Sequence, residues 1–307
     1  MARLFDAYIM VDWSAAAKPA TGANSVWIGI LARDARLKFQ FRAVNPDTRT
    51  KARAFLVDMI GKLLARGDKV LLGFDFALGY PAGTADAANF DTEAVPPWQA
   101  MFEFLSSRLK EREDNSRADE RFAVAASLNY KISGGQFPFW GAMSQRHQSA
   151  TLGQKKTAFD SDRAVAEHRM VESMLRKQPG ATPKTVWQLG GQGSVGSQSL
   201  MGIPHVATIK SSFEGARLWP FELGLDELTD EGLQGVNLVI TEIYPSLIPT
   251  KPAPGTVLDA AQVETMARHY CDLDGKDRLG ALFMGPEGKT EAEMSQIQAE
   301  EGWILGI

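Results

Sequence analysis

The chain has 307 residues, is 44 % hydrophobic and carries a formal net charge of −4, without a block of lysines or arginines. Its length allows a large core in one elaborated domain or two, and its charge argues against nucleic-acid binding driven by bulk charge, leaving room only for a local basic groove. The single cysteine, Cys271, excludes an intramolecular disulfide and a cysteine metal cage. No apolar run approaches the roughly 20 residues of a membrane span, so we expect a cytoplasmic protein without a membrane partner.

The first part of the chain predicts three strands, a helix and a fourth strand. The expected strands cover residues 8–11, 25–32, 37–44 and 69–76. The unbroken apolar run at 8–11 is typical of a strand buried on both faces, whereas the alternation at 37–44 is typical of an edge strand with one wet face. Asp47 or Thr48 can cap a helix that ends near Arg66.

A long segment interrupts this regular pattern after Gly79. Residues 80–235 are more polar and more irregular than what precedes them, with helical patterns separated by loops. The charge-rich run at 111–121 predicts a solvated helix face or a surface loop.

The regular pattern returns near residue 236. We expect a fifth strand at 237–243, followed by helices at 259–271 and 276–284. The core is therefore predicted to consist of residues 1–79 and 236–307, with the intervening residues inserted as helices and irregular loops.

An acidic residue stands at the edge of each of four apolar core segments. These acids are Asp12, Asp75, Glu242 and Asp277. A carboxylate at the end of a buried strand is unfavourable unless something pairs with it. We therefore interpret the chain as a scaffold that brings the four acids to one place.

This order of strands, helices and acids resembles the ribonuclease H-like fold. The blocks FDFALGYP, TEIYPSL and KDRLGALFM are similar to those of an uncharacterised bacterial family of predicted ribonuclease H-like nucleases. The resemblance implies an α/β fold with a mixed five-stranded sheet flanked by helices and a long insertion between the fourth and fifth strands. It implies that Asp12, Asp75, Glu242 and Asp277 are the catalytic acids. Arg278 stands where the family has a small or apolar residue, which leaves Asp274 as the alternative late acid.

The resemblance further implies a divalent-metal-dependent phosphodiester hydrolase, with Mg²⁺ or Mn²⁺ bound by the four acids. Hard cations prefer carboxylate oxygens, and two ions about 4 Å apart clamp the attacking and leaving oxygens of a phosphodiester. In this arrangement Asp12 bridges both ions, and the substrate is a nucleic acid or a small phosphoester.

Other residues could meet the substrate phosphate. The candidates are Ser14, Lys18, Gly193, Ser194 and Lys276. Residues 191–196 read GQGSVG, but a dinucleotide site needs a full helix after the glycines. We expect Gly202 and Pro204 to limit that helix to about two turns, so the glycines predict a tight loop whose amides can bind phosphate or carboxylate.

Two further functions fit the sequence. The Asp12-Trp13-Ser14 and Asp75-Phe76-Ala77 segments resemble the phosphate loops of actin-like and sugar kinases, which bind ATP, although both lack the glycine that lets backbone approach phosphate. A non-catalytic binding module on the same fold is the third hypothesis, because each acid taken alone can cap a helix or satisfy loop amides.

Overall fold

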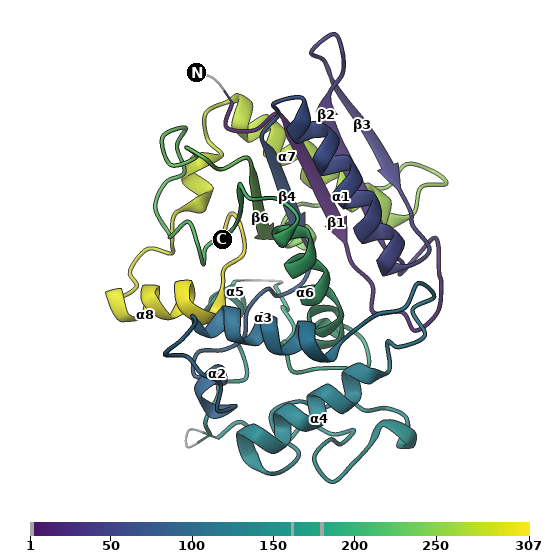
Figure 1. The fold of residues 1–307 in the computed structure, drawn as a ribbon, viewed down its shortest axis with the longest axis vertical. Coiled ribbons are helices and arrows are strands. Elements are labelled where there is room, and N and C mark those ends of the chain that lie inside the picture. Colours follow the sequence, from purple (N-terminus) through teal and green to yellow (C-terminus); the bar gives the residue numbers. More distant parts are fainter. Residues whose placement is uncertain (1–2, 161–162, 179–180) are drawn as a thin grey trace.

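The computed structural model describes residues 3–160, 163–178 and 181–307, and within them six strands form one mixed sheet flanked by helices (Figure 1). The strands are β1 (Ala7–Asp12), β2 (Trp27–Arg33), β3 (Phe39–Val44), β4 (Val70–Phe74), β5 (Ala216–Leu218) and β6 (Leu238–Glu242). They lie in the order β3-β2-β1-β4-β6-β5. The first three pair antiparallel, and β4, β6 and β5 run parallel to β1.

The predicted strand number of five is wrong by one. The additional strand, β5, belongs to the segment between β4 and β6 and pairs with β6 at the edge of the sheet. It has only three residues, too few for a period of two to be recognised in the sequence.

Helices flank the sheet. The α-helices are α1 (Arg49–Ala65), α2 (Thr84–Ala87), α3 (Pro97–Arg108), α4 (Glu120–Ser133), α5 (Met170–Leu175), α6 (Val195–Ser211), α7 (Leu258–Gly275) and α8 (Glu291–Gln296). Of these, α2, α3 and α4 lie below the sheet in the view of Figure 1. Short 3-10 turns are η1 (Gln145–His147), η2 (Pro245–Leu247) and η3 (Gly280–Phe283), and η4 (Ile297–Glu301) is a π-helix. The predicted cap of α1 is confirmed, since Thr48 Oγ1 accepts a hydrogen bond from the Lys51 N–H. No helix in the three described ranges is long and apolar enough to cross a membrane.

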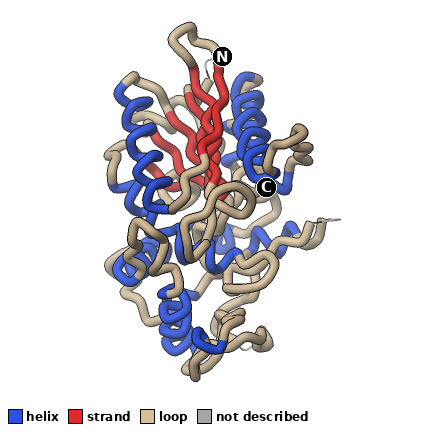
Figure 2. The backbone as a smooth tube through the Cα atoms, turned by 90° about the vertical axis from the view of Figure 1, so that its right-hand side faces the viewer, coloured by secondary structure: helices blue, strands red, loops and turns tan. Residues whose placement is uncertain are grey.

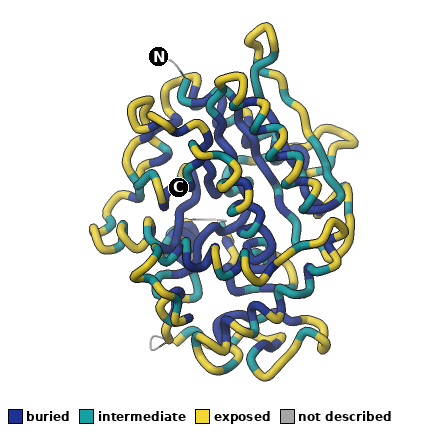
Figure 3. Tube along the Cα trace, in the orientation of Figure 1, coloured by how far each residue is buried: buried dark blue, intermediate teal, exposed yellow. Residues whose placement is uncertain are grey.

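Helices cover both faces of the sheet, as the view along its edge shows (Figure 2). Ile9 and Val11 of β1 join an apolar cluster with α1, whereas Tyr8 and Met10 join a second cluster with α7. The central strands β1, β4 and β6 are accordingly almost fully buried, whereas the edge strand β3 is partly exposed (Figure 3). The alternation of side chains along a strand therefore decides which helix a residue at the strand end faces.

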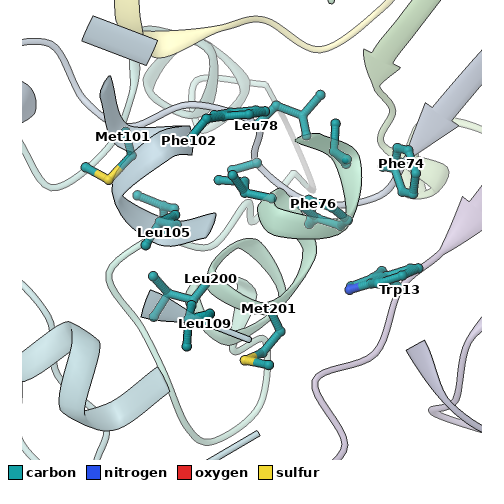
Figure 4. Packing of buried hydrophobic residues seen from close by; sticks show 14 of the residues in the cluster. Trp13, Phe74, Phe76, Leu78, Met101, Phe102, Leu105, Leu109, Leu200 and Met201 are labelled. Carbon is teal, nitrogen blue, oxygen red and sulfur yellow. The ribbon is translucent and has the colours of Figure 1, made fainter. Parts of the chain in front are cut away.

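The segment between β4 and β6 shares the core of the sheet. Side chains of α3 and α6, among them Leu105 and Leu200, pack together beside Phe76 (Figure 4). The contact is close enough that a Cβ at Gly202 of α6 would lie 2.2 Å from the Phe76 ring. These helices are therefore packed directly on the end of β4.

Two helix predictions are wrong. Helix α6 continues through Pro204 for 17 residues, because burying several apolar side chains at about 1.5–3 kcal/mol each outweighs the roughly 3 kcal/mol that an internal proline costs. The helix predicted at 276–284 is instead the turn η3, because Asp277 adopts a left-handed φ of 57° just after α7 ends.

Candidate functional site

Asp12 and Asp75 meet at the C-terminal ends of two adjacent parallel strands. Asp12 is the last residue of β1 and Asp75 directly follows β4, and the pairing of Val11 with Phe74 brings the two strand ends level. Their carboxyl groups are close enough for the Asp75 charge to raise the pKa of Asp12. The Trp13 backbone N–H also donates to Asp75 Oδ1 at 2.7 Å, which fixes the orientation of that carboxyl group.

The two carboxyl groups disfavour each other's ionisation. Burial is the largest cause that raises the pKa of Asp12, followed by the charges of Asp75 and Asp259. Burial also raises the pKa of Asp75, against the opposing effect of the Trp13 N–H bond. Because the groups titrate as a pair, they hold one proton between them near neutral pH unless a cation replaces it.

Asp259 is a third acid beside this pair, and the sequence analysis missed it. It lies in the first turn of α7, where its Oδ2 accepts a 2.7 Å hydrogen bond from the Asn24 N–H, and it lines the same cavity as Asp12. Helix α7 returns antiparallel along β1, since Asp274 near its other end bonds the Leu4 and Phe5 amides. A helix that returns along β1 must begin near Asp12, and this was the signal available in the sequence.

Asp12 and Asp259 line a cavity of about 500 Å³ together with polar groups of α4 and α6. Arg121 of α4 donates through Nε to Ser197 Oγ at 2.9 Å, and burial lowers the pKa of Arg121 to about 10, which leaves it charged at neutral pH. Gln198 Nε2 donates to the Trp13 carbonyl at 2.7 Å. The cavity therefore contains one cation, Arg121, together with the carboxyl groups of Asp12 and Asp259.

The glycine-rich loop before α6 also lines this cavity. Gly191 and Gly193 have left-handed φ angles of 89° and 76°, and both line the cavity. A Cβ at Gly193 would lie 2.5 Å from Lys184 Cγ, so glycine is needed there for space as well as for conformation. Ser194 follows with φ −76°, and this alternation of sign is typical of a backbone nest whose amides bind an anion.

Glu242 does not join the other acids, contrary to the prediction. It pairs in register with Phe74, one residue before Asp75, and follows Ile240 onto the face of the sheet that α1 covers. There Arg169 holds it through two hydrogen bonds of 2.8 and 2.6 Å. A shift of one residue along a strand turns a side chain to the opposite face, which explains the separation.

Asp277 also lies elsewhere, and so does its alternative, Asp274. Asp274 is buried at the N-terminal end of β1, where it accepts hydrogen bonds from the Leu4 and Phe5 amides, whereas Asp12 ends the same strand. Within the described ranges, no group of three or more histidine, cysteine, aspartate or glutamate side chains is arranged to hold a metal ion. The predicted four-acid site for two ions is therefore not what this fold builds.

Of the predicted phosphate contacts, some belong to the Asp12 cavity and others lie elsewhere. Ser14, Gly193 and Ser194 line the Asp12 cavity, but Lys18 and Lys276 do not. Lys18 is exposed, and Lys276 pairs with Asp272 near the far end of α7. The basic residue of the site is Arg121, which lies at the end of the charge-rich run.

The donor set nevertheless fits one hard cation. Asp12 and Asp75 offer carboxylate oxygens in mutual contact, and Mg²⁺ commonly binds to one or two carboxylates, completing its shell with waters and substrate phosphates. A cation between them would also remove the repulsion that raises their pKa values. Asp12 and Asp75 are thus the residues that would hold Mg²⁺ or Mn²⁺, with Asp259 facing them.

A buried ion pair fixes the backbone that follows Asp12. Arg49 donates to the carbonyls of Ser14 and Ala16 at 3.0 and 2.7 Å and forms a two-point bond with Glu111. The Glu111 side chain is only 5 % exposed, so the prediction of a solvated charge run is wrong at this position. His205 contacts Glu111 through Nε2 at 3.3 Å.

A scan against protein-family models found no match, and searches of curated proteins and of solved structures found no similar protein. The function is therefore argued below from the geometry of the site.

Proposed function

We propose that the chain is a phosphodiester hydrolase of the ribonuclease H-like type that uses Mg²⁺ or Mn²⁺ and a reduced acid set. The acids are Asp12 and Asp75 as metal ligands and Asp259 as their neighbour. The observation that carries the proposal is that Asp12 and Asp259 line one cavity together with Arg121 and the Gly191–Ser194 loop, while Asp75 lies beside Asp12 at the end of the neighbouring strand. Carboxylates bind the ion, and the same cavity offers donors for the phosphate that the ion activates.

The strand arrangement supports the ribonuclease H-like assignment. An antiparallel β1–β3 meander is followed by β4 and β6 parallel to β1, with acids at the ends of β1 and β4. This is the order that the sequence resemblance implies. The added β5 lies at the outer edge and leaves the order of the other five unchanged.

Each of the site residues has its own role in the proposed reaction. Arg121 and the amides near Gly193 bind the non-bridging phosphate oxygens, which positions the phosphorus above the acid pair. Asp259, held by the Asn24 N–H, accepts a proton from the attacking water. A bound divalent ion supplies Lewis-acid polarisation of the phosphoryl oxygen.

The size of the cavity favours a small substrate. About 500 Å³ matches the range of pockets that enclose a small molecule, and the net charge of −4 offers no bulk attraction for a duplex. The substrate class is therefore a small phosphodiester or the end of a single strand.

The test is Mn²⁺-stimulated hydrolysis of bis(p-nitrophenyl) phosphate and of short oligonucleotides. Asp12→Asn should lower the metal-stimulated rate by at least about a hundredfold, since it removes a metal ligand. Asp58→Asn, an exposed acid on α1, is the matched control and should retain full activity. Purified protein that binds neither ion and cleaves none of these substrates would rule the proposal out.

A phosphotransferase is the second candidate function. It is favoured by one observation, the glycine-rich loop before α6 that lines the same cavity as Asp12, because the amides of such a loop bind nucleotide phosphates. ATP with Mg²⁺ separates the two: transfer of phosphate to an added alcohol indicates a kinase. If millimolar Mn²⁺ leaves the acids metal-free, the third hypothesis, a non-catalytic binding module, is favoured.

A further inference from the structure

A second cavity of about 280 Å³ lies between α1, α3 and α6 and shares no lining residue with the Asp12 cavity. Helices α3 and α6 frame it where Leu105 and Leu109 pack near Leu200 (Figure 4). The polar side chains that line it are Arg53, Ser106, Lys110, Glu111, His205 and Thr208. The proposed hydrolysis uses none of them.

The cavity carries an excess of positive charge. Arg53 is half-buried and Lys110 is exposed, and neither forms a salt bridge within the part of the chain that the structure describes. The one carboxylate in the wall, Glu111, is neutralised by its two-point bond with the buried Arg49. The positive charges of Arg53 and Lys110 therefore remain without a counter-charge around this cavity.

Two buried polar atoms in the same wall also lack partners. Among the described residues, neither Ser106 Oγ nor His205 Nδ1 has a hydrogen-bond partner, and His205 is only 2 % exposed. Leaving such a group unsatisfied costs about 1–3 kcal/mol. In native proteins an unsatisfied group of this kind needs an explanation, and a missing ligand is one.

We propose that this cavity is a binding site for a dianionic phosphate group. Arg53 and Lys110 match its charge, because an arginine and a lysine are the usual partners of phosphate. The Ser106 hydroxyl is a donor without an acceptor, and phosphate oxygens are strong acceptors. His205 keeps its Nε2 contact with Glu111, and its imidazole lies in the wall of the site, where an anion bound by Arg53 and Lys110 changes its surroundings.

The remainder of a phosphorylated ligand has a place next to this site. An apolar cavity of about 430 Å³ lined by Trp98 and Phe102 adjoins it, because Ser106 and Thr208 line both. Inorganic phosphate and a phosphomonoester with an apolar group are therefore the two sources of the anion. Phenyl phosphate represents the second source in the experiment.

The experiment follows the imidazole NMR signals of His205 in the full chain during titration with inorganic phosphate and with phenyl phosphate. We expect saturable shifts with at least one of them, and tighter binding of phenyl phosphate identifies the phosphomonoester as the source. The double variant Arg53→Ala/Lys110→Ala should weaken binding at least about tenfold, because it removes two charge-assisted contacts. Ser106→Ala should weaken it about threefold to tenfold.

Two controls separate this site from other effects. Arg36→Ala/Lys38→Ala removes the same charge at the exposed turn between β2 and β3 and should leave the affinity unchanged. Arg121→Ala should also leave the His205 shifts intact, which separates this site from phosphate in the Asp12 cavity, whether or not the chain proves to be a hydrolase. The proposal is overturned if His205 does not respond to either ligand, or if Arg53→Ala/Lys110→Ala binds as tightly as the unmodified chain.

Discussion

The carboxyl group of Asp75 raises the pKa of Asp12 because β1 and β4 are adjacent, parallel and level at their C-terminal ends. No other pairing in the sheet brings two acids together in this way, among the strands that the structure describes. The contact is unfavourable when both groups are ionised.

Asp12→Asn should stabilise the metal-free protein. Burial and the neighbouring charges raise the pKa of the folded Asp12 above its unfolded value, so the folded state loses stability as pH rises and the pair ionises. At pH 8 in the presence of a chelator, urea denaturation should show a gain of about 1–2 kcal/mol in the free energy of unfolding. The gain should shrink as the pH falls below about 4, where the unmodified carboxyl group becomes neutral in the unfolded state as well, and Asp58→Asn should produce none of this behaviour. A loss of stability at pH 8 would contradict the repulsion.

Asp259 and Asp277 form a matched pair of acids on or just after α7. Asp259→Asn should lower the metal-stimulated rate at least about tenfold, because it removes a carboxylate facing the acid pair. Asp277→Asn should leave the rate unchanged, and asparagine tolerates the left-handed conformation of that position. Steady-state rates of the two variants test this directly, and the reverse ranking would restore the late acid that the sequence suggested.

Glu242→Gln should reduce stability and leave metal affinity intact. The carboxylate of Glu242 is bound by Arg169 and by the Leu78 N–H, so the variant leaves a buried guanidinium with one fewer counter-charge. We expect a loss of about 3 kcal/mol in the free energy of unfolding. Calorimetric titration with Mn²⁺ should give the same dissociation constant within about twofold. A large loss of Mn²⁺ affinity in a stable Glu242→Gln variant would show that Glu242 is a ligand after all.

Glu111→Gln should loosen the backbone after Asp12. It leaves Arg49 buried without its carboxylate partner, which costs about 3–5 kcal/mol. Because Arg49 also holds the Ser14 and Ala16 carbonyls, hydrogen exchange should increase first at residues 14–17. If hydrogen exchange at residues 14–17 keeps the rate of the unmodified chain although the variant is destabilised, the Arg49–Glu111 ion pair does not hold the backbone after Asp12.

Because of Glu300, the free energy of unfolding should decrease as the pH rises from 4.5 to about 7. Burial raises the pKa of Glu300 from 4.5 to about 7, although its carboxyl oxygens accept bonds from the Gly83 and Ala85 amides. Between these two values the folded state holds the proton that the unfolded state has lost, so the free energy of unfolding should decrease by about 1–3 kcal/mol across that window. Glu300→Gln should flatten this dependence in urea titrations, whereas Glu287→Gln, at an exposed position, should preserve it.

The sequence predicted the sheet well because its central strands are continuous apolar runs. Residues 8–11 cover most of β1 and residues 69–76 contain all of β4, and an acid at the end of each could be expected at a common edge. The first helix was predictable for the same kind of reason, since Thr48 caps it locally. These features depend on neighbours in the chain.

The rest of the site depends on contacts between distant segments. The face to which Glu242 points is set by the register of β6 against β4, which differs by one residue from what a shared site would need. The length of α6 is set by burial around Pro204, and Arg121 reaches the cavity only because α4 packs near the start of that helix. The residues next to Glu242, Pro204 and Arg121 in the sequence do not predict any of these three features.

The central claim is that a single divalent ion binds between Asp12 and Asp75. A crystal soaked in millimolar Mn²⁺ and measured at the manganese absorption edge gives the ion's position directly. We predict one anomalous peak within about 2.0–2.4 Å of an oxygen of each of these two carboxylates, and no peak at Glu242 or Asp277. A peak on Glu242 with Arg169 displaced, or no peak near Asp12 at saturating Mn²⁺, would contradict the account.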